Sequence, residues 1–507
     1  MMLDRTLFRI KLALKLTLPA GALSCALAAQ APAAEITIAQ STDATSLDPA
    51  FRADTVTGNV MRHIFDTLLE RKADMSFGGG LAEQVVQNTP TEWTLKLRRG
   101  VKFSNGEDFN AEALKFSIDR AKNPDLKAPT RGWWLPFKTV TVVDEHTVKI
   151  ETAGPDPLFR SRLTLFAPVP PKYLREVGDA AFSRKPVGTG PYKLSDWRRD
   201  EAAILEPNPA YWGEKAKFTR VTFRVIPEEL ARIAALQTGE ADVVANLSPA
   251  QAAALERSRG WRVERVASTR IASIQFDNGI APGDAQKFRE AVAHAINRDE
   301  IIKGLLRGYA APINSILSPG VPEWPSDKNY TRPHDPQKAA ALVKELGLGN
   351  QEILLRTPSG RYPNDRETAL AVGAQLQKVG LNVKVRPDEW NRFFEDLKAH
   401  KVSPVYLMGQ GNIWFDPYPQ IEAFQKSTGF LSTWKDPEVD TLLARSNEVP
   451  LSERPQVFGK ILDRLNETVA AVPLYAHLVL YGVREGVTWK ARPDEQVLAS
   501  EMSKAGK

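Results

Sequence analysis

Pro186-Val-Gly-Thr-Gly-Pro-Tyr192 is the stretch of the chain that says most about its architecture. Its two prolines fix the backbone angle φ, and Gly188 and Gly190 permit angles that a side chain excludes. Because neither glycine has a side chain, another group can approach the main chain, and Thr189 between them offers a hydroxyl and an N–H. Two interpretations stay open from these residues: a rigid turn between two elements, or a contact of Thr189 and Gly190 with a ligand.

The N-terminus has the order of a secretory signal. Basic residues within the first 15 positions precede the apolar stretch 16–27, and Ala31-Pro32-Ala33 supplies small residues at the spacing of a cleavage site. The apolar stretch is shorter than the ~20 residues that span a bilayer. We expect residues 1–34 to be a signal peptide that is cleaved on export to the periplasm. A lipid anchor on Cys25 is the less favoured alternative, because lipoprotein signals place a small residue where this chain has Leu23.

The composition is that of an ordinary globular protein. The 507 residues are 43% hydrophobic and 25% charged, and a chain of this length suggests more than one lobe. Cys25 is the only cysteine, so the exported chain would have no thiol for disulfides, metal ligands or nucleophiles. The net charge of +6 comes without a run of five basic residues, which argues against a nucleic-acid partner.

Strands and helices alternate along the second half of the chain, which predicts an α/β protein whose sheets are covered by helices. No low-complexity linker separates the lobes, so we expect the chain to cross between them more than once, as at a hinge. In the first half, the apolar spacing predicts a helix over 60–69, and Asn110 is placed to cap a helix over 111–121. The expected elements of the second half include helices 227–238, 285–295, 336–346 and 365–379, and strands 272–276, 352–356 and 382–387.

Six short stretches follow one another along almost the whole chain behind the signal. They are Ser46–Pro49, Trp93–Phe103 with Asn105-Gly106, Pro186–Tyr192, Asn208–Gly213, Arg289–Arg298 and Val472–Tyr475. In this order they resemble the extracytoplasmic solute-binding proteins of ABC importers, in family 5, the dipeptide, oligopeptide and nickel branch. The resemblance implies a two-lobed periplasmic-binding-protein fold of type II with an inserted subdomain. It also implies a receptor that captures a peptide or peptide-like solute between the lobes and delivers it to an inner-membrane permease.

The same resemblance implies how the chain is divided. Lobe I would take residues 35–65, 185–272 and 475–507, the inserted subdomain 66–184, and lobe II 273–474. The crossings between the lobes would lie near Ile274–Asp277 and Val472–Tyr475 and serve as the hinge. Such a receptor would be a monomer without a cofactor.

An arginine and an acid hold the two ends of the peptide in the dipeptide binders that this chain resembles. The segment Thr357–Asn364 resembles the arginine-bearing segment, which implies that Arg361 holds a carboxylate, and the planar guanidinium suits that pairing. In the segment that normally presents the acid, the expected position falls at Asn412 or at an isoleucine. Asp416 lies further on, before a proline, where it is either a ligand residue or a turn former. An anionic or polyhydroxylated solute, such as an opine, a sugar conjugate or an N-blocked peptide, therefore competes with an ordinary dipeptide.

Aromatic residues complete the expected site. Trp390, Trp414 and Tyr418 lie in or beside the segments that would line lobe II, and a Trp ring offers a large rigid surface for stacking. We expect Trp414, in a loop rich in Gly and Pro, to be the strongest of these candidates. Trp133-Trp134 could reach the cleft from the inserted subdomain, although packing inside the subdomain is the favoured interpretation.

The sequence offers little that points to an enzyme. The six histidines are not spaced as a metal pair, and neither H-E-x-x-H nor G-x-S-x-G occurs. We therefore expect no catalytic residue and no resident metal. A nickel chelate or haem as the solute stays as an alternative, and a secreted hydrolase stays as a weaker one.

Overall fold

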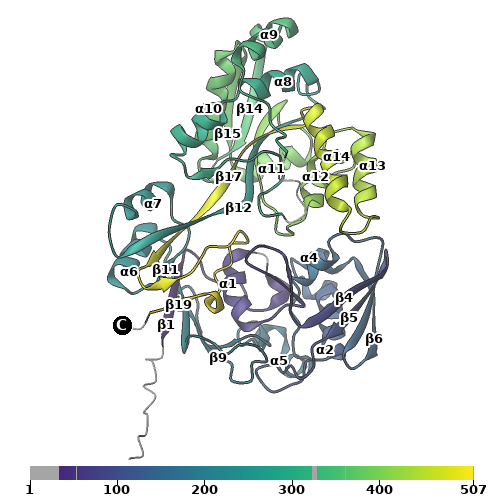
Figure 1. The fold of residues 1–507 in the computed structure, drawn as a ribbon, viewed down its shortest axis with the longest axis vertical. Coiled ribbons are helices and arrows are strands. Elements are labelled where there is room, and N and C mark those ends of the chain that lie inside the picture. Colours follow the sequence, from purple (N-terminus) through teal and green to yellow (C-terminus); the bar gives the residue numbers. More distant parts are fainter. Residues whose placement is uncertain (1–33, 53, 322–327, 360, 506–507) are drawn as a thin grey trace, which may run out of the picture.

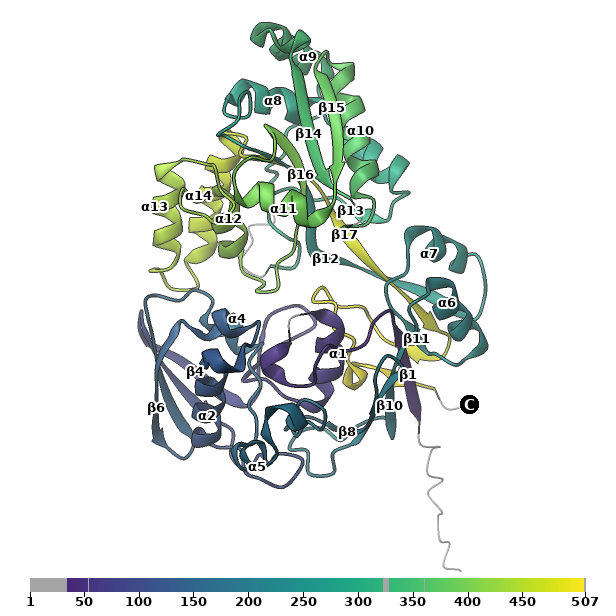
Figure 2. The same cartoon turned by 180° about the vertical axis from the view of Figure 1, so that it is seen from behind.

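The computed structural model describes residues 34–505, apart from 53, 322–327 and 360, so the expected signal and Cys25 lie outside the described residues. Two long strands, β12 (Trp261–Phe276) and β17 (Ala471–Arg484), run side by side from the lower to the upper half of the molecule (Figure 1). The view from behind shows the same two halves meeting around these strands (Figure 2). Among the described residues, none of the helices has the length and apolarity needed to cross a bilayer.

One 11-stranded sheet passes through both halves, in the order β15-β14-β16-β12-β17-β11-β1-β10-β9-β8, with β13 added to β17. We call the half with β11 to β8 lobe I and the half with β15 to β16 lobe II. The strands of lobe I are β1 (Glu35–Gln40), β8 (Tyr192–Arg198), β9 (Ala202–Pro207), β10 (Arg220–Val225) and β11 (Val243–Val244). Those of lobe II are β13 (Ala310–Ala311), β14 (Glu352–Pro358), β15 (Asn382–Asp388) and β16 (Val405–Gln410).

The change from one lobe to the other falls at an irregularity in the β12–β17 ladder. The antiparallel register slips between Ala267 and Ile271. After the slip, β12 also pairs with β16, from Ile271 to Phe276, while β11 joins β17 at its far end. The crossing therefore lies before the expected 274–277, because those residues are already held in the sheet of lobe II. Bulges bend a strand and interrupt its pairing, so this is the place where the ladder is easiest to flex.

A separate four-stranded antiparallel sheet forms the inserted subdomain, in the order β4-β5-β7-β6. The Asn110 side chain accepts from the Ala113 N–H at 3.0 Å, so the expected cap of α2 is present. The Trp93 and Phe159 rings stack 4.2 Å apart in a core of its own. The elements here are β2 (Leu69–Arg71), β3 (Phe77–Gly79), β4 (Ala82–Thr89), β5 (Glu92–Leu97), α2 (Ala111–Lys122), α3 (Arg131–Trp134), β6 (Phe137–Asp144), β7 (Thr147–Thr152), α4 (Phe159–Leu163) and α5 (Pro171–Phe182).

Helices cover both lobes, as the α/β alternation predicts. In lobe I, α6 (Glu229–Thr238) ends at Gly239 in the left-handed conformation (φ 82°), where a glycine is favoured. The residue limits expected for the lobes and the insert stay a prediction. The remaining helices of lobe I are α1 (Thr55–Ile64), α6 (Glu229–Thr238) and α7 (Pro249–Leu255). Lobe II has α8 (Gln286–Ala295), α9 (Pro336–Leu346), α10 (Asp365–Lys378), α11 (Trp390–Lys398), α12 (Pro417–Gln425), α13 (Pro437–Ser446) and α14 (Arg454–Glu467).

His63 ties α1 to the last described segment of the chain. Its Nδ1 lies 2.8 Å from the Asn59 carbonyl oxygen and its Nε2 lies 2.9 Å from the Ala499 N–H. A carbonyl only accepts and a backbone N–H only donates, so the neutral ring with its proton on Nδ1 satisfies both. Burial lowers the pKa of His63 to about 4, with the Asn59 carbonyl acting against it. The tether therefore requires an uncharged imidazole.

Acidification is expected to destabilise the fold through this histidine. The folded pKa lies below the ordinary value of 6.5, so the unfolded chain takes up the proton first, and stability is lost as the pH falls from about 6.5 towards 4. The full loss is about 3 kcal/mol. Urea unfolding at neutral and acidic pH measures it. His63→Gln should reduce the pH dependence by about this amount and leave the part due to His477, whose pKa burial also lowers to about 4. The same change at the exposed His334 should leave the dependence intact. Equal slopes in the two variants would contradict the assignment.

Candidate functional site: the cleft between the lobes

A cavity of about 510 Å³ lies where the two lobes and the inserted subdomain meet. Lobe I contributes α1 with the residues before it and the loop 493–496, lobe II contributes the segments 361–362 and 411–415, and the insert contributes Trp133 and its neighbours. Small-molecule sites commonly measure about 300–1,000 Å³. The cavity therefore has the size of a site for one small solute.

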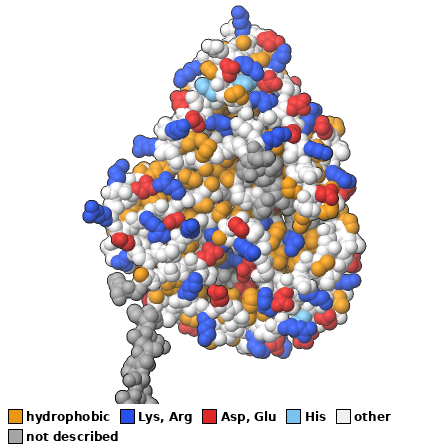
Figure 3. Space-filling view, in the orientation of Figure 1, with side chains coloured by type: hydrophobic (Ala, Val, Ile, Leu, Met, Phe, Trp, Pro, Cys, Tyr) orange, Lys and Arg blue, Asp and Glu red, His pale blue; other side chains and the backbone are white. Residues whose placement is uncertain are grey.

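A second chamber of about 630 Å³ adjoins the first. The two share Arg270, Arg361, Tyr362 and Glu495, so these side chains form a polar partition within one cleft. Behind it the lining includes the apolar side chains of Leu478 and Leu480. Figure 3 shows hydrophobic side chains gathered at the height of β17, above the charged side chains along the boundary between the lobes.

Five arginines line the first chamber, and two of them are held by protein oxygens. Arg62 donates to the Thr67 hydroxyl, and Arg71 is held by bonds that include the Met75 carbonyl (2.8 Å). Among residues 34–505 as described, no acid lies within ion-pair distance of Arg52, Arg270 or Arg361, the other three. Burial, reinforced by the Arg62 charge, lowers the pKa of Arg52 to about 10, which leaves it cationic at neutral pH. The chamber thus offers three guanidinium groups to an anionic solute.

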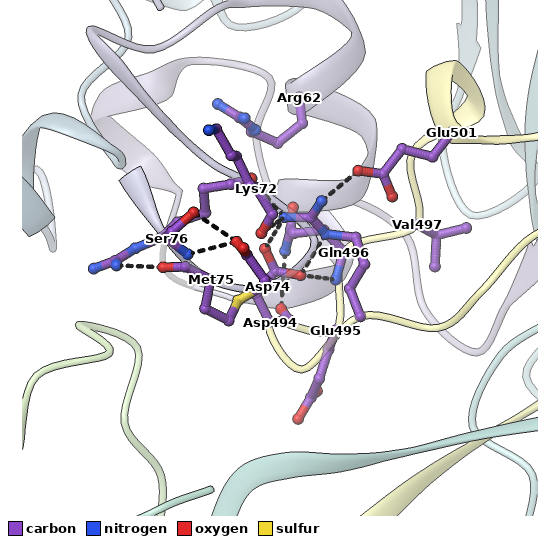
Figure 4. Close-up of polar contacts among 12 residues, drawn as sticks. Arg62, Lys72, Asp74, Met75, Ser76, Asp494, Glu495, Gln496, Val497 and Glu501 are labelled. Atoms are coloured by element: carbon purple, nitrogen blue, oxygen red, sulfur yellow. Dashed lines mark hydrogen bonds and ion pairs between the residues drawn. The ribbon is translucent and has the colours of Figure 1, made fainter. Parts of the chain in front are cut away.

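Three acids line the same chamber, and two of them are fully occupied. Asp54 caps α1, accepting from the Thr57 N–H at 2.7 Å and from the Thr57 hydroxyl at 2.9 Å. Asp494 pairs with Arg492 through Nε at 2.9 Å and Nη2 at 2.7 Å. The third is Glu495, whose carboxylate has no hydrogen bond or ion pair with any described residue. Figure 4 shows its side chain pointing away from the polar cluster around Asp494.

Arg361 lies in the lining of both chambers, on an aromatic support. Its guanidinium is 5.0 Å from the Trp390 ring centroid and 5.5 Å from that of Tyr362. Its backbone N–H donates to Asp365 at 3.0 Å, which fixes the segment. Stacking of a guanidinium on rings restricts its orientation. Trp390 therefore stands behind Arg361 instead of facing the cavity as a platform of its own.

The side chains of Asn412 and Asp416, in the segment 409–418, form their hydrogen bonds and ion pairs within lobe II. Asn412 borders the cavity, but its amide donates to the Asp416 carbonyl at 2.8 Å and to Gln420 at 3.1 Å. The Asp416 carboxylate forms a buried two-bond pair with Arg454, at 2.8 and 2.9 Å. It also accepts from the Tyr418 N–H at the start of α12. The turn-former interpretation of Asp416 fits this placement, because neither of its oxygens is offered to the cleft.

Tyr418 also lies away from the cleft lining. Its hydroxyl donates to Glu422 at 3.2 Å, and its ring packs against the core around α13 and α14. Of the two interpretations of such an aromatic residue, packing is the one that the structure favours here.

Trp414 joins lobe II to the inserted subdomain. Its ring meets Trp133 edge-on, with centroids 5.3 Å apart, and lies 5.1 Å from the Arg162 guanidinium. Its carbonyl accepts from Arg71 Nη2 at 2.7 Å. Trp414 therefore contacts the inserted subdomain on the opposite side of the cleft. Trp133 lines the cavity, whereas Trp134 is buried within the insert.

Thr189 and Gly190 lie outside both chambers. The Gly190 N–H donates to the Ile64 carbonyl at 2.9 Å, and the buried Thr189 hydroxyl accepts from the Asp66 N–H at 3.3 Å. A Cβ on Gly188 would stand 2.2 Å from the Ile64 oxygen. The glycines therefore permit a close approach to the end of α1. The helix α1 ends at Ile64, earlier than the predicted residue 69. The rigid-turn interpretation is the one that fits.

The residues that sequence reasoning missed come from segments without a motif. Arg52 precedes α1 and Arg62 lies in its last turn. Arg270 lies within the register slip of β12, and Glu495 lies beyond the last matched stretch. The only signal for Glu495 is its position after the segment Val472–Tyr475, where the chain was expected to cross between the lobes. In the described part of the chain, no group of three or more His, Cys, Asp or Glu side chains is arranged to hold a metal.

Comparisons with known proteins agree with this architecture. The model of the bacterial extracellular solute-binding proteins, family 5, matches residues 76–432. The glutathione-binding protein GsiB of Salmonella choleraesuis is 32% identical over 360 residues, covering 70% of this chain and 69% of its own. HbpA2 from Haemophilus parasuis superposes with a TM-score of 0.85 at 22% identity, covering 93% of this chain and 100% of that one. AgaA of A. tumefaciens R10, solved with agropinic acid, gives 0.72 at 23% identity over 93% and 99%. The chain is thus a member of family 5 of the bacterial extracellular solute-binding proteins, which serve ABC importers.

Proposed function

We propose that this receptor captures a short peptide-like solute with two carboxylates and one ammonium, of which glutathione is the model. The observation that supports it is the trio of guanidinium groups on Arg52, Arg270 and Arg361 that line a chamber of about 510 Å³. None of the three forms an ion pair with a described acid. Each desolvated carboxylate–guanidinium pair contributes about 1.5–3 kcal/mol. The relatives named for glutathione binding point to the same chemistry.

The solute would touch both lobes. Arg52 and Arg270 belong to lobe I and Arg361 to lobe II, so a molecule paired with both sets is bound better when the lobes are near each other. The slip in the β12–β17 ladder at Ala267–Ile271 is the place for the bending that closure needs. The permease would then recognise the loaded form.

The remaining assignments complete the proposal. Residues 1–34 are a signal peptide and the mature protein works in the periplasm as a monomer, with lobe I, the insert and lobe II divided as the resemblance implies. The protein carries its solute without altering it. Arg361 binds a carboxylate, Trp390 supports Arg361, and Trp414 with Asn412 shapes the loop that faces the insert.

Calorimetric titration of the purified protein tests the proposed solute. We expect glutathione to bind with a Kd near or below the micromolar range, about −8 kcal/mol, and a neutral-chain dipeptide such as Met-Leu to bind at least about tenfold more weakly, because it lacks the second carboxylate. Equal binding of both peptides would contradict the two-carboxylate requirement. Binding of agropinic acid alone would instead favour an opine as the solute.

A further inference from the structure

We infer that Glu495 binds the ammonium group of the solute, and so supplies from lobe I the acid that the segment 409–418 does not offer. The inference rests on the proposed function, because it assigns a partner to one charged group of that solute. On this inference, Glu495 makes the receptor selective for solutes with an amino group over analogues that lack it.

Glu495 is the acid of the cleft lining whose carboxylate has no hydrogen bond or ion pair with a described residue. Glu229, in the lining of the second chamber, accepts a hydrogen bond from the Ser248 N–H. The Asp54 and Asp494 carboxylates are both engaged, by α1 and by Arg492 respectively. In lobe II the Asp416 carboxylate is buried against Arg454. The Glu495 carboxylate borders both chambers and has no partner in the described part of the chain. Although Arg270 lines the same chambers, no described cation lies within ion-pair distance of this carboxylate, so it is open to a cationic group of the solute.

The backbone of Glu495 is in a strained conformation. Glu495 has a φ of 60°, in the left-handed region that residues other than glycine rarely adopt. Such a conformation persists only where neighbouring contacts hold it. Here the Tyr481 hydroxyl donates to the Glu495 carbonyl at 3.4 Å, and the Val497 N–H donates to Asn59 at 3.0 Å.

The residues before Glu495 are anchored just as firmly. Arg492 donates to the Arg71 carbonyl at 2.8 Å and pairs with both Asp494 and Glu501 (Figure 4). With both flanks fixed, the strained residue is aimed at the cleft and away from this cluster. Preorganisation of this kind lowers the entropy lost when a ligand binds.

The charge around Glu495 suits a zwitterionic end. Burial raises the pKa of Glu495, while the charge of Arg270 acts in the opposite direction. Arg270 and Glu495 share the partition between the chambers, so an amino acid end can place its carboxylate towards the arginine and its ammonium towards the glutamate. Arg270 and Glu495 together would bind both charged groups of the amino acid end of the solute.

A double-mutant cycle between protein and solute tests the inference. The probes are glutathione and glutaryl-cysteinylglycine, which is glutathione without its amino group, titrated by calorimetry into the wild type and into Glu495→Gln. We expect loss of the amino group to weaken binding to the wild type by about 10- to 100-fold, as does Glu495→Gln with glutathione. The variant should then bind the two probes within about threefold of each other, because without the Glu495 carboxylate the amino group of glutathione has no acid to pair with.

The control is Glu485→Gln, which removes the same charge from an exposed position of the same C-terminal segment. It should bind glutathione as the wild type does, and all three proteins should melt at similar temperatures. Additive losses, or a wild type that binds both probes equally, would overturn the role of Glu495 while leaving the proposed function intact. A wild type that binds neither probe would overturn the proposed function and this inference with it.

Discussion

Arg361→Ala is expected to weaken the binding of glutathione by about 10- to 100-fold while leaving the fold unchanged. The guanidinium borders both chambers, has no carboxylate partner among the described residues, and stands on the rings of Trp390 and Tyr362. Its removal deletes a charge-assisted pair without exposing a buried acid. Calorimetry with glutathione measures the loss, and the melting temperature reports on the fold.

Arg366→Ala is the matched control, because Arg366 is exposed at the start of α10, just beyond the same segment. It should bind glutathione like the wild type. If Arg361→Ala binds as tightly as Arg366→Ala, Arg361 is not the carboxylate anchor, and Arg52 and Arg270 must hold both carboxylates.

Gly188→Ala is expected to destabilise lobe I by about 3 kcal/mol, at the upper end of the usual cost of overpacking. The added Cβ would stand 2.2 Å from the Ile64 carbonyl oxygen and 2.7 Å from the Phe65 ring. The backbone at the end of α1 is fixed by its own hydrogen bonds, so neither group can move away cheaply. Urea unfolding followed by circular dichroism should show a lower midpoint.

Gly79→Ala provides the comparison, since a Cβ at Gly79 meets nothing within 4 Å. Its stability should stay within about 0.5 kcal/mol of the wild type. Similar midpoints for Gly188→Ala and Gly79→Ala would mean that the contact with Ile64 is not rigid, and the interpretation of the Gly-Thr-Gly run as a structural turn would fail.

Local patterns predicted most of the regular structure. The α/β alternation gave the helices and strands of lobe II, and Asn110 and Gly239 marked helix ends correctly because capping depends on only a few neighbouring residues. The long strand β17 and the helices α13 and α14 were not expected, since buried strands and helices can share the same apolar composition.

The cleft was harder to predict because it is assembled from distant segments. Arg361 and Asn412 could be located from the resemblance, and both border the cavity. Asp416 and Tyr418 have the right residue types, but the pairing of Asp416 with Arg454 and the packing of Tyr418 are set by lobe II as a whole. Glu495 reaches the cleft only because its loop turns back beside α1, which no local pattern encodes.

The ladder of β12 and β17 limits how this molecule can move. Both connections between the lobes are adjacent strands bonded to each other, and their register shifts between Ala267 and Ile271 and again between Ala272 and Ser273. A ribbon of this kind bends most easily where its pairing is interrupted, so we expect opening to be a bend at that place. One cross-link between cysteines engineered on opposite sides of the mouth, at positions whose Cα atoms lie about 4.4–6.8 Å apart, would then arrest the whole motion. In a mature chain that lacks Cys25, no native thiol would compete with it.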